Sequence, residues 1–251
     1  MFGAFYKRAP ADFGVLRADM HAHILPGVDD GAQTPEESLI LLNALQSMGF
    51  TQVFATPHIS RNFYPNSREN LLPAAAQLQQ VLRDRDIQLQ LGLAAEYYLD
   101  EHFESLLHQD TLLTLPGNYI LFEMSYFHAW PGLSRTLFEL IRRTYRPILA
   151  HPERYPYFRG KYFYLLEDLR DRGISFQINL LSLQGVYGRE TRRCALRMLE
   201  AGLVDFLGTD VHHVQHLAAL EDFRRSGRCH RLLEKYEFQN GTLAVSARPT
   251  R

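Results

Sequence analysis

Two histidines near the start of the chain, His21 and His23, stand two residues apart in an apolar stretch. The side chains of a strand alternate between its two faces, so residues two apart point to the same side. Two imidazoles held in this way can chelate a metal ion. The sequence therefore predicts a metal site that further donors must complete.

Five later segments each place a His, Asp or Glu side chain directly after an apolar run. Their candidate donors are His58, Glu96, Glu123, His151, Asp210 and His212. Imidazole and carboxylate donors without a thiolate suit Mn, Fe, Zn or Mg rather than Cu(I) or an iron–sulfur cluster. Together these donors predict a site that holds more than one metal ion.

The segments that must position these donors alternate between short apolar runs and longer amphipathic stretches. The predicted strands are 16–24, 52–56, 87–96, 119–124, 147–150, 174–179 and 204–208. The predicted helices are 34–48, 67–85, 100–109, 133–145, 161–172 and 189–201. The first helix has a clear start, because Thr34 can cap it and Glu37 can complete a capping box. Strands that alternate with helices indicate a mostly parallel sheet.

Nearly every candidate donor lies at the C-terminal end of a predicted strand. A closed ring of strands gathers these ends around one point, whereas an open Rossmann-like sheet would scatter the outermost donors. The chain also has no glycine-rich nucleotide fingerprint. We therefore predict a single-domain α/β fold, a distorted seven-stranded TIM-like (β/α)7 barrel, over residues 16–240. Residues 1–15 are expected to form an N-terminal leader and residues 241–251 an irregular C-terminal tail.

The bulk composition excludes several classes of protein. The chain has 251 residues and a formal net charge of −1, and its charged residues are mixed along the sequence, so no nucleic-acid partner is expected. Cys194 and Cys229 form no Cys-x-x-Cys pair and are expected to be packed free thiols. No apolar run is long enough for a transmembrane segment, and residues 1–8 lack the apolar core of a signal peptide. A cytoplasmic location is therefore expected.

Seven short motifs occur in order between about Asp19 and Leu220. They are Asp-x-His-x-His, Asp-Asp-Gly, Thr-Pro-His, Ala-Glu-Tyr, Phe-Glu, Ala-His-Pro-Glu-Arg-Tyr and Thr-Asp-x-His-His. This set resembles the polymerase and histidinol phosphatase (PHP) superfamily. Within it, the chain is most similar to the manganese-dependent protein-tyrosine phosphatases of bacterial capsule and exopolysaccharide synthesis.

The resemblance implies two or three divalent metal ions, manganese foremost, and a PHP-type barrel. It places the first ion at His21, His23 and Asp210, with Glu96 bridging to a second ion at Glu123 and His151, and a third ion at Asp30, His58 and His212. The implied substrate is phosphotyrosine on a partner protein, namely the tail of a kinase of polysaccharide assembly. Relatives commonly carry an arginine a few residues after Asp-x-His, whereas residues 214–216 here are Val, Gln and His.

Such a metal cluster suits phosphate-ester hydrolysis by a bridging hydroxide, because nearby ions lower the pKa of a shared water and neutralise phosphoryl oxygens. Arg154 follows His151 by three residues, so its planar guanidinium can clamp the phosphate from the same loop. We expect Arg154 to be the catalytic and substrate-binding arginine. Arg61 is a second substrate-binding candidate. Neither cysteine lies in a Cys-x5-Arg loop, so phosphocysteine chemistry is not expected.

Several neighbouring side chains have a purely structural interpretation. Asp29 and Asp30 precede Gly31 and also fit a tight turn. Glu153 is expected to point away from the site and to pair locally. Aromatic residues are frequent in 62–66, 126–130 and 155–164, where they could stack on a phosphotyrosine ring or pack within the loops.

Two other functions remain open at this point. A small-molecule phosphatase of the histidinol-phosphate type, or a PHP phosphodiesterase, would use the same metal donors. A non-catalytic, metal-bound regulatory module that binds a kinase tail would also keep them. Nothing in the sequence indicates an oligomeric state.

Overall fold

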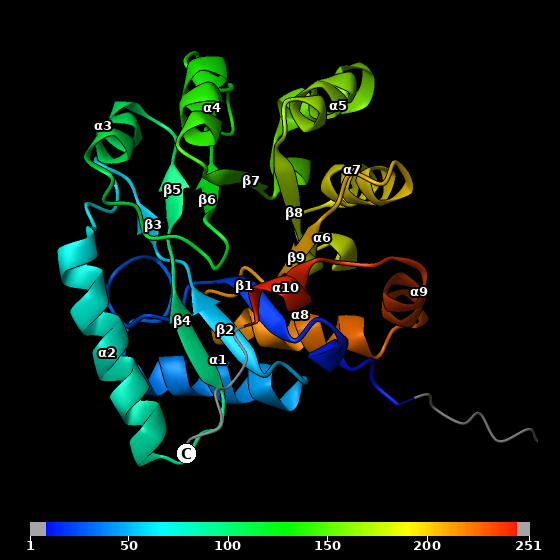
Figure 1. The fold of residues 1–251 in the computed structure, drawn as a ribbon. Helices are drawn as coiled ribbons and strands as arrows, with labels where there is room; N and C mark the ends of the chain where they lie inside the picture. Colours follow the sequence, from blue (N-terminus) through cyan, green and yellow to red (C-terminus); the bar gives the residue numbers. More distant parts are fainter. Residues whose placement is uncertain (1–8, 245–251) are drawn as a thin grey trace, which may run out of the picture.

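The computed structural model describes residues 9–244, which form an α/β fold in which all the sheet pairings are parallel (Figure 1). The strands in this range are β1 (Ala18–Ala22), β2 (Gln52–Ala55), β3 (His58–Ile59), β4 (Gln90–Leu93), β5 (Glu96–Tyr98), β6 (Tyr119–Glu123), β7 (Arg146–Ala150), β8 (Ser175–Asn179) and β9 (Phe206–Gly208). The parallel α/β class predicted from the alternation of elements is confirmed.

Helices connect these strands and cover their outer side. They are α1 (Pro35–Ser47), α2 (Arg68–Asp84), α3 (Glu101–Gln109), α4 (Leu133–Arg142), α5 (Tyr164–Asp171), α6 (Leu180–Gln184), α7 (Arg189–Glu200), α8 (Val214–Arg224), α9 (Gly227–Lys235) and α10 (Asn240–Leu243). Four short 3-10 segments, η1 (Phe13–Val15), η2 (Pro152–Arg154), η3 (Pro156–Phe158) and η4 (Gly160–Tyr162), complete the order. The expected start of α1 is confirmed, since Thr34 accepts a hydrogen bond from the backbone of Glu37 at 3.2 Å. The Glu37 carboxylate, however, accepts from the backbone of Gln33 rather than of Thr34.

The strands form two hydrogen-bonded sheets, of order β1-β2-β4 and β3-β5-β6-β7-β8-β9. The predicted strand 52–56 ends at Ala55 as β2, and Thr56 and Pro57 separate it from the short strand β3, which was not predicted. The predicted strand 87–96 is broken, because Ala94 and Ala95 separate β4 from β5. Proline has no N–H to donate to a neighbouring strand, which is one reason for the first break. A single closed ring of seven strands is therefore not seen in the hydrogen bonds of residues 9–244, where the pairing gives a sheet of three and a sheet of six.

The first strand also lies beside the segment that follows the last one. A parallel bridge joins Ala22 to Val211, and the backbone N–H of His23 donates to Val211 at 2.9 Å. One residue earlier, the N–H of Asp210 donates to the carbonyl of His21 at 2.8 Å. These bonds hold His21 and His23, the first candidate donors in the sequence, beside Asp210, one of the last.

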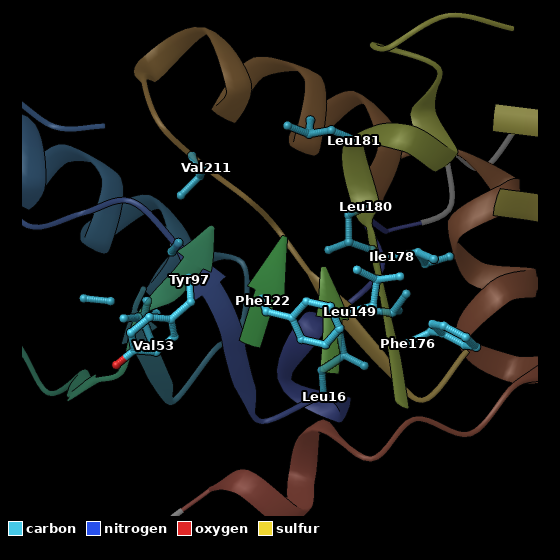
Figure 2. Packing of buried hydrophobic residues seen from close by; sticks show 14 of the residues in the cluster. Leu16, Val53, Tyr97, Phe122, Leu149, Phe176, Ile178, Leu180, Leu181 and Val211 are labelled. Carbon is cyan, nitrogen blue, oxygen red and sulfur yellow. The ribbon is translucent and has the colours of Figure 1, made fainter. Parts of the chain in front are cut away.

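Most strands are buried on both faces, as is usual for parallel sheets, whereas β4 is partly exposed. Leu121 and Ile148 belong to a smaller buried cluster, to which β1, β2 and β9 also contribute. Their sequence neighbours Phe122 and Leu149 point the other way, into the larger cluster. Figure 2 shows Phe122 and Leu149 side by side there, as their strand register requires. Full burial of one such side chain contributes about 1.5–3 kcal/mol.

The ends of the chain are described only in part. Residues 1–8 of the expected leader and residues 245–251 of the expected tail lie outside the described range. Within it, Phe13 is buried, and Gly241 lies in the short helix α10. Among the described helices, none combines the length and the apolar character that crossing a membrane requires.

Candidate metal centre

The candidate donors gather where strands end or restart. His21 belongs to β1, and His23 follows it directly. The breaks between β2 and β3 and between β4 and β5 place His58 and Glu96 at the first positions of β3 and β5, where they are register partners. Glu123 ends β6. The starts of β3 and β5 thus place His58 and Glu96 next to each other in the larger sheet.

Two further donors follow β7 and β9 in an unusual backbone conformation. His151 has φ of 35° and Asp210 has φ of 52°. Side chains other than glycine rarely adopt positive φ, and such strain is concentrated at functional sites. For Asp210, the backbone bond to His21 holds this conformation in place. Both turns direct buried side chains toward His21 of β1.

Four buried donors form the centre of the cluster. One ligand atom each from His21, His23, Glu96 and Asp210 lies within 4.8 Å of the other three. The Nε2 atoms of His21 and His23 are 3.2 Å apart, and Nε2 of His21 is 3.1 Å from Glu96 and 3.4 Å from Asp210. Donors separated by about 190 residues therefore meet at one point, as the sequence predicted.

Two more groups adjoin this one. The first contains His58, Glu96 and Glu123, and the second contains His23, Asp30, His58 and His212. His58 takes part in both, because its Nδ1 lies 3.2 Å from Glu123 and its Nε2 lies 3.6 Å from Asp30. His151 contacts the shared carboxylate, with Nε2 2.9 Å from Oε1 of Glu96. All nine predicted donors thus belong to one continuous cluster.

Hydrogen bonds at Nδ1 fix the orientation of three imidazoles. Nδ1 of His21 donates to the side-chain carbonyl of Gln177 at 2.9 Å, and Nδ1 of His23 donates to Asp29 at 2.8 Å. Nδ1 of His212 donates to the backbone carbonyl of Asp210 at 2.9 Å. Each ring therefore presents Nε2 to the centre, which is the arrangement of metal-binding histidines. The donor set and its orientation fit divalent metal ions.

Opposite charges face one another at the centre and shift the pKa values of its side chains. Burial lowers the pKa of His21, but the carboxylates of Glu96 and Asp210 outweigh it and raise the value to about 9. Burial raises the pKa of Glu96 and that of Asp210, yet the facing histidines hold both well below the usual range. At the outer side, burial and the neighbouring His23 lower the pKa of His212 to about 4. The carboxylates thus concentrate negative charge where a cation would lie.

Arg154 stands at the edge of this cluster, as predicted. Its guanidinium donates to Asp210 at 3.3 Å. Two rings flank it, with the Cζ of Arg154 4.3 Å from the centre of Tyr187 and 5.1 Å from that of Tyr126. Arg61, in contrast, is exposed in a turn and is not among the residues that line the pocket over the cluster.

That pocket has a volume of about 260 Å³. Its floor is formed by donors of the cluster, and its wall by Arg154 and the aromatic residues Phe63, Tyr64, Tyr98 and Tyr126. The ring of Tyr64 stacks on His58 at 5.2 Å. By contrast, Tyr155 from the third aromatic segment is fully buried, and its hydroxyl accepts from the backbone N–H of Met124 at 3.0 Å. The aromatic segments therefore divide between the pocket wall and internal packing.

Several supporting residues were not recognised in the sequence. Asp29 is more than a turn residue, since its carboxylate also accepts from the backbone of His58 at 3.1 Å. Asn179 donates to Asp210 at 2.6 Å. Glu153 is fully buried, and instead of pairing locally it accepts from the backbone of Asn179, 26 residues away, at 2.9 Å. The doublet of carboxylates at Asp29 and Asp30 was the one signal in the sequence for such a role.

Comparison with known proteins agrees with this geometry. A family model described as capsular polysaccharide synthesis, CpsB/CapC, matches residues 17–235. The tyrosine-protein phosphatase YwqE of Bacillus subtilis (strain 168) is 33% identical over 198 residues, which cover 78% of each chain. The tyrosine-protein phosphatase CpsB of Streptococcus pneumoniae is 26% identical over 202 residues, covering 78% of this chain and 83% of CpsB.

Solved structures give the same result. A crystal structure from work on YwqE of Bacillus subtilis and CpsB of Streptococcus pneumoniae, described as metal-dependent tyrosine phosphatases, matches with a TM-score of 0.76 and 30% identity. The match covers 88% of this chain and 96% of that one. The phosphotriesterase homology protein of Escherichia coli, with phosphate in its active site, has a TM-score of 0.54 at 13% identity over 94% of this chain and 96% of its own, and shares the fold alone. The resemblance drawn from the motifs is confirmed: the chain belongs to the CpsB/CapC family of capsular polysaccharide synthesis proteins.

Proposed function

We propose that this protein is a metal-dependent protein-tyrosine phosphatase. The observation that carries the proposal is the position of nine metal donors beneath a pocket whose wall holds one arginine and several aromatic rings. The names of YwqE and CpsB support the same reaction, since both are tyrosine-protein phosphatases. Phosphoric monoester hydrolysis is the class of reaction that such a site performs.

We infer that the cluster binds two or three divalent ions, with manganese the first candidate and Fe, Zn or Mg the others. The proposed ligands of the first ion are His21, His23 and Asp210, those of the second are Glu123 and His151 with Glu96 shared, and those of the third are Asp30, His58 and His212. When bound, the ions would supply a water of lowered pKa and positive charge for the phosphoryl oxygens. His58, a proposed ligand of the third ion, also contacts Glu123, a proposed ligand of the second, at 3.2 Å.

In this proposal, Arg154 binds the phosphoryl group through its planar donors. Tyr126 and Tyr187 keep the guanidinium in place by stacking on its two sides. Its bond to Asp210 joins the phosphate clamp to the donor cluster. Arg61 stays a prediction, which its exposed position does not support.

The pocket wall favours an aryl phosphate. Tyr64, Tyr98, Phe63 and Tyr126 surround the space above the donors and can pack against the ring of phosphotyrosine. The leaving phenol has a pKa of about 10, far below that of an alcohol, so its departure requires little help from a general acid. The aromatic wall and the undemanding leaving group together support phosphotyrosine over phosphoserine.

We further propose that the two sheets are two parts of one distorted barrel within a single domain of residues 16–240. In support, the smaller buried cluster takes side chains from β1 and β2 as well as from β6, β7 and β9. The bridge between Ala22 and Val211 joins the two ends of the strand series. Membership of a capsule-synthesis family supports a cytoplasmic partner, the phosphorylated tail of a polysaccharide-assembly kinase.

A panel of substrates tests this function. Phosphate release is measured with a phosphotyrosyl peptide, a phosphoseryl peptide, histidinol phosphate and a nucleotide diester, each with added Mn²⁺ and with chelator. We expect metal-dependent turnover of the phosphotyrosyl peptide in preference to the others. Preference for histidinol phosphate or the diester would contradict the substrate, and peptide binding without turnover under any metal would indicate a regulatory module.

A further inference from the structure

A basic groove runs along α7 and α9, outside the metal centre. Two adjoining hollows, of about 740 and 380 Å³, share the side chains of Arg192 and Leu196 and so form one continuous depression, here called the α7–α9 groove. Figure 1 shows both helices on the same side of the molecule, away from α2. The groove is large enough to hold several residues of an extended chain.

The lining of the groove is strongly cationic. Its positive side chains are Arg189, Arg192, Arg193 and Arg197 from α7 and Arg228, Arg231 and Lys235 from α9. Glu200 is the one carboxylate among the lining residues. Since the whole chain has a net charge of −1, this positive charge is a local concentration rather than a general property.

These charges are only partly neutralised within the protein. Arg193 pairs with Glu190 at 2.7 Å, but Arg197 and Arg228 bond to neutral oxygens of Gly160 and Gln184. Nε of Arg192 is buried without a hydrogen-bond partner. Burial, followed by the charges of Arg192 and Arg231, lowers the pKa of Arg228. Repulsion among the arginines would be relieved by an anionic ligand.

The groove begins beside the candidate active site. Tyr187, whose ring stacks on Arg154, lies two residues before Arg189, the first residue of α7. Arg159 connects the two regions, because its guanidinium donates both to the carbonyl of Arg154 and to Thr191 in α7. The start of α7, and with it the end of the groove at Arg189, therefore lies near Arg154.

We propose that the α7–α9 groove binds an acidic segment of the phosphotyrosine polypeptide, next to the residue that is dephosphorylated. This inference rests on the proposed function and specifies its substrate as an acidic or multiply phosphorylated chain. The concave shape and the apolar side chains of Leu183, Leu196 and Phe223 between the charges suit a polypeptide better than a flat bilayer surface. Complementary charges of this kind speed the association of two molecules and favour a partner of opposite charge.

The test compares two charge-reversed proteins. The first carries Arg189→Glu and Arg228→Glu, both exposed residues of the groove. The control carries Arg83→Glu and Arg85→Glu at the far end of α2, with the same change in net charge on exposed residues. KM and kcat are measured with a long acidic phosphotyrosyl peptide, a short neutral one and p-nitrophenyl phosphate. We expect KM for the acidic peptide to rise about tenfold in the groove variant, with kcat/KM for the small substrates within about twofold.

Three results would overturn the groove proposal. One is an unchanged KM for the acidic peptide, and another is an equal rise in the groove variant and the control. The third is that phosphatidylglycerol vesicles bind the wild type and not the groove variant, while the peptide KM stays the same, which would make the groove a membrane contact. Absence of turnover with every phosphotyrosyl substrate would instead contradict the proposed function. Fluorescence anisotropy of the labelled acidic peptide would then still test the groove, since only the groove variant should lose binding.

Discussion

Asp29 holds His23 in place from outside the donor cluster. Its carboxylate accepts from Nδ1 of His23 at 2.8 Å, which leaves Nε2 of the same ring 3.3 Å from Glu96 and 3.5 Å from Asp210. The other face of the site depends on it too, because Asp29 accepts from the backbone of His58. One carboxylate that is not itself in the donor groups therefore orients ligands from two strands.

Replacement of Asp29 by Asn should weaken metal binding while leaving the donors unchanged. The neutral amide still fits the space, but it lacks the charge that makes His23 a stronger ligand. Loss of a carboxylate that hydrogen-bonds a metal-binding histidine typically lowers metal affinity by about 10- to 100-fold, and we expect a loss of this size. Titration calorimetry with Mn²⁺ measures it. Asp86→Asn, at an exposed carboxylate after α2, is the matched control. Equal affinities for Asp29→Asn and wild type would refute this role.

Arg154 and Arg61 should differ sharply as alanine variants. Loss of Arg154 removes the guanidinium at the pocket wall, so kcat/KM for a phosphotyrosyl peptide should fall by about 100-fold or more. Arg61→Ala should stay within about twofold of wild type, since exposed charges contribute little. Steady-state kinetics at saturating Mn²⁺ compare the two. A large loss for Arg61 with a small one for Arg154 would reverse the assignment of the phosphate clamp.

The affinity for metal should rise with pH. The carboxylates of Glu96 and Asp210 raise the pKa of His21 to about 9 against the opposing effect of burial, so this imidazole holds a proton at neutral pH in the metal-free protein. A histidine must be neutral to bind a metal ion, and binding therefore releases that proton, with a gain of about tenfold in affinity per pH unit per proton. Calorimetry in two buffers of different ionisation enthalpy counts the protons. Affinity that does not change between about pH 6 and 8 would show that the histidines are already neutral.

Asp19 should make the metal-free protein less stable as the pH rises. Burial raises its pKa to about 6 from 3.8, despite hydrogen bonds from Thr209. The folded state thus binds this proton more tightly than the unfolded chain, so the stability it contributes is complete below pH 3.8 and is lost as the pH passes through about 6. Asp19→Asn should raise the free energy of unfolding at pH 7 by about 1–3 kcal/mol and leave it unchanged near pH 3.5. Urea unfolding at both pH values checks this, and a less stable variant at pH 7 would contradict it.

The sequence predicted the donors better than it predicted what holds them. His21, Glu96 and Asp210 were readable because each is a polar residue at the end of an apolar run. Gln177 and Asn179 were not, because alternating amides in a buried strand have no distinctive pattern, and their role depends on β8 lying beside β9. Asp29 was hidden by the turn chemistry that it shares with Asp30.

The same limit applies to the fold. The alternation of elements predicted the parallel pairing, but the breaks at residues 56–57 and 94–95 divide the hydrogen bonds into two sheets. The helix α6 was missed because it follows β8 directly and has only 5 residues, too few to show a helical pattern. The α7–α9 groove could not be predicted, since it depends on how two helices separated in sequence pack together.

The central claim is that these donors bind a cluster of metal ions beside Arg154. The most direct test is an anomalous difference map from crystals of the protein grown with Mn²⁺ and recorded at the manganese absorption edge. The account predicts two or three strong peaks enclosed by His21, His23, Glu96, Asp210 and the neighbouring donors. A map without peaks there, from protein that hydrolyses phosphotyrosine in the same Mn²⁺ solution, would contradict it.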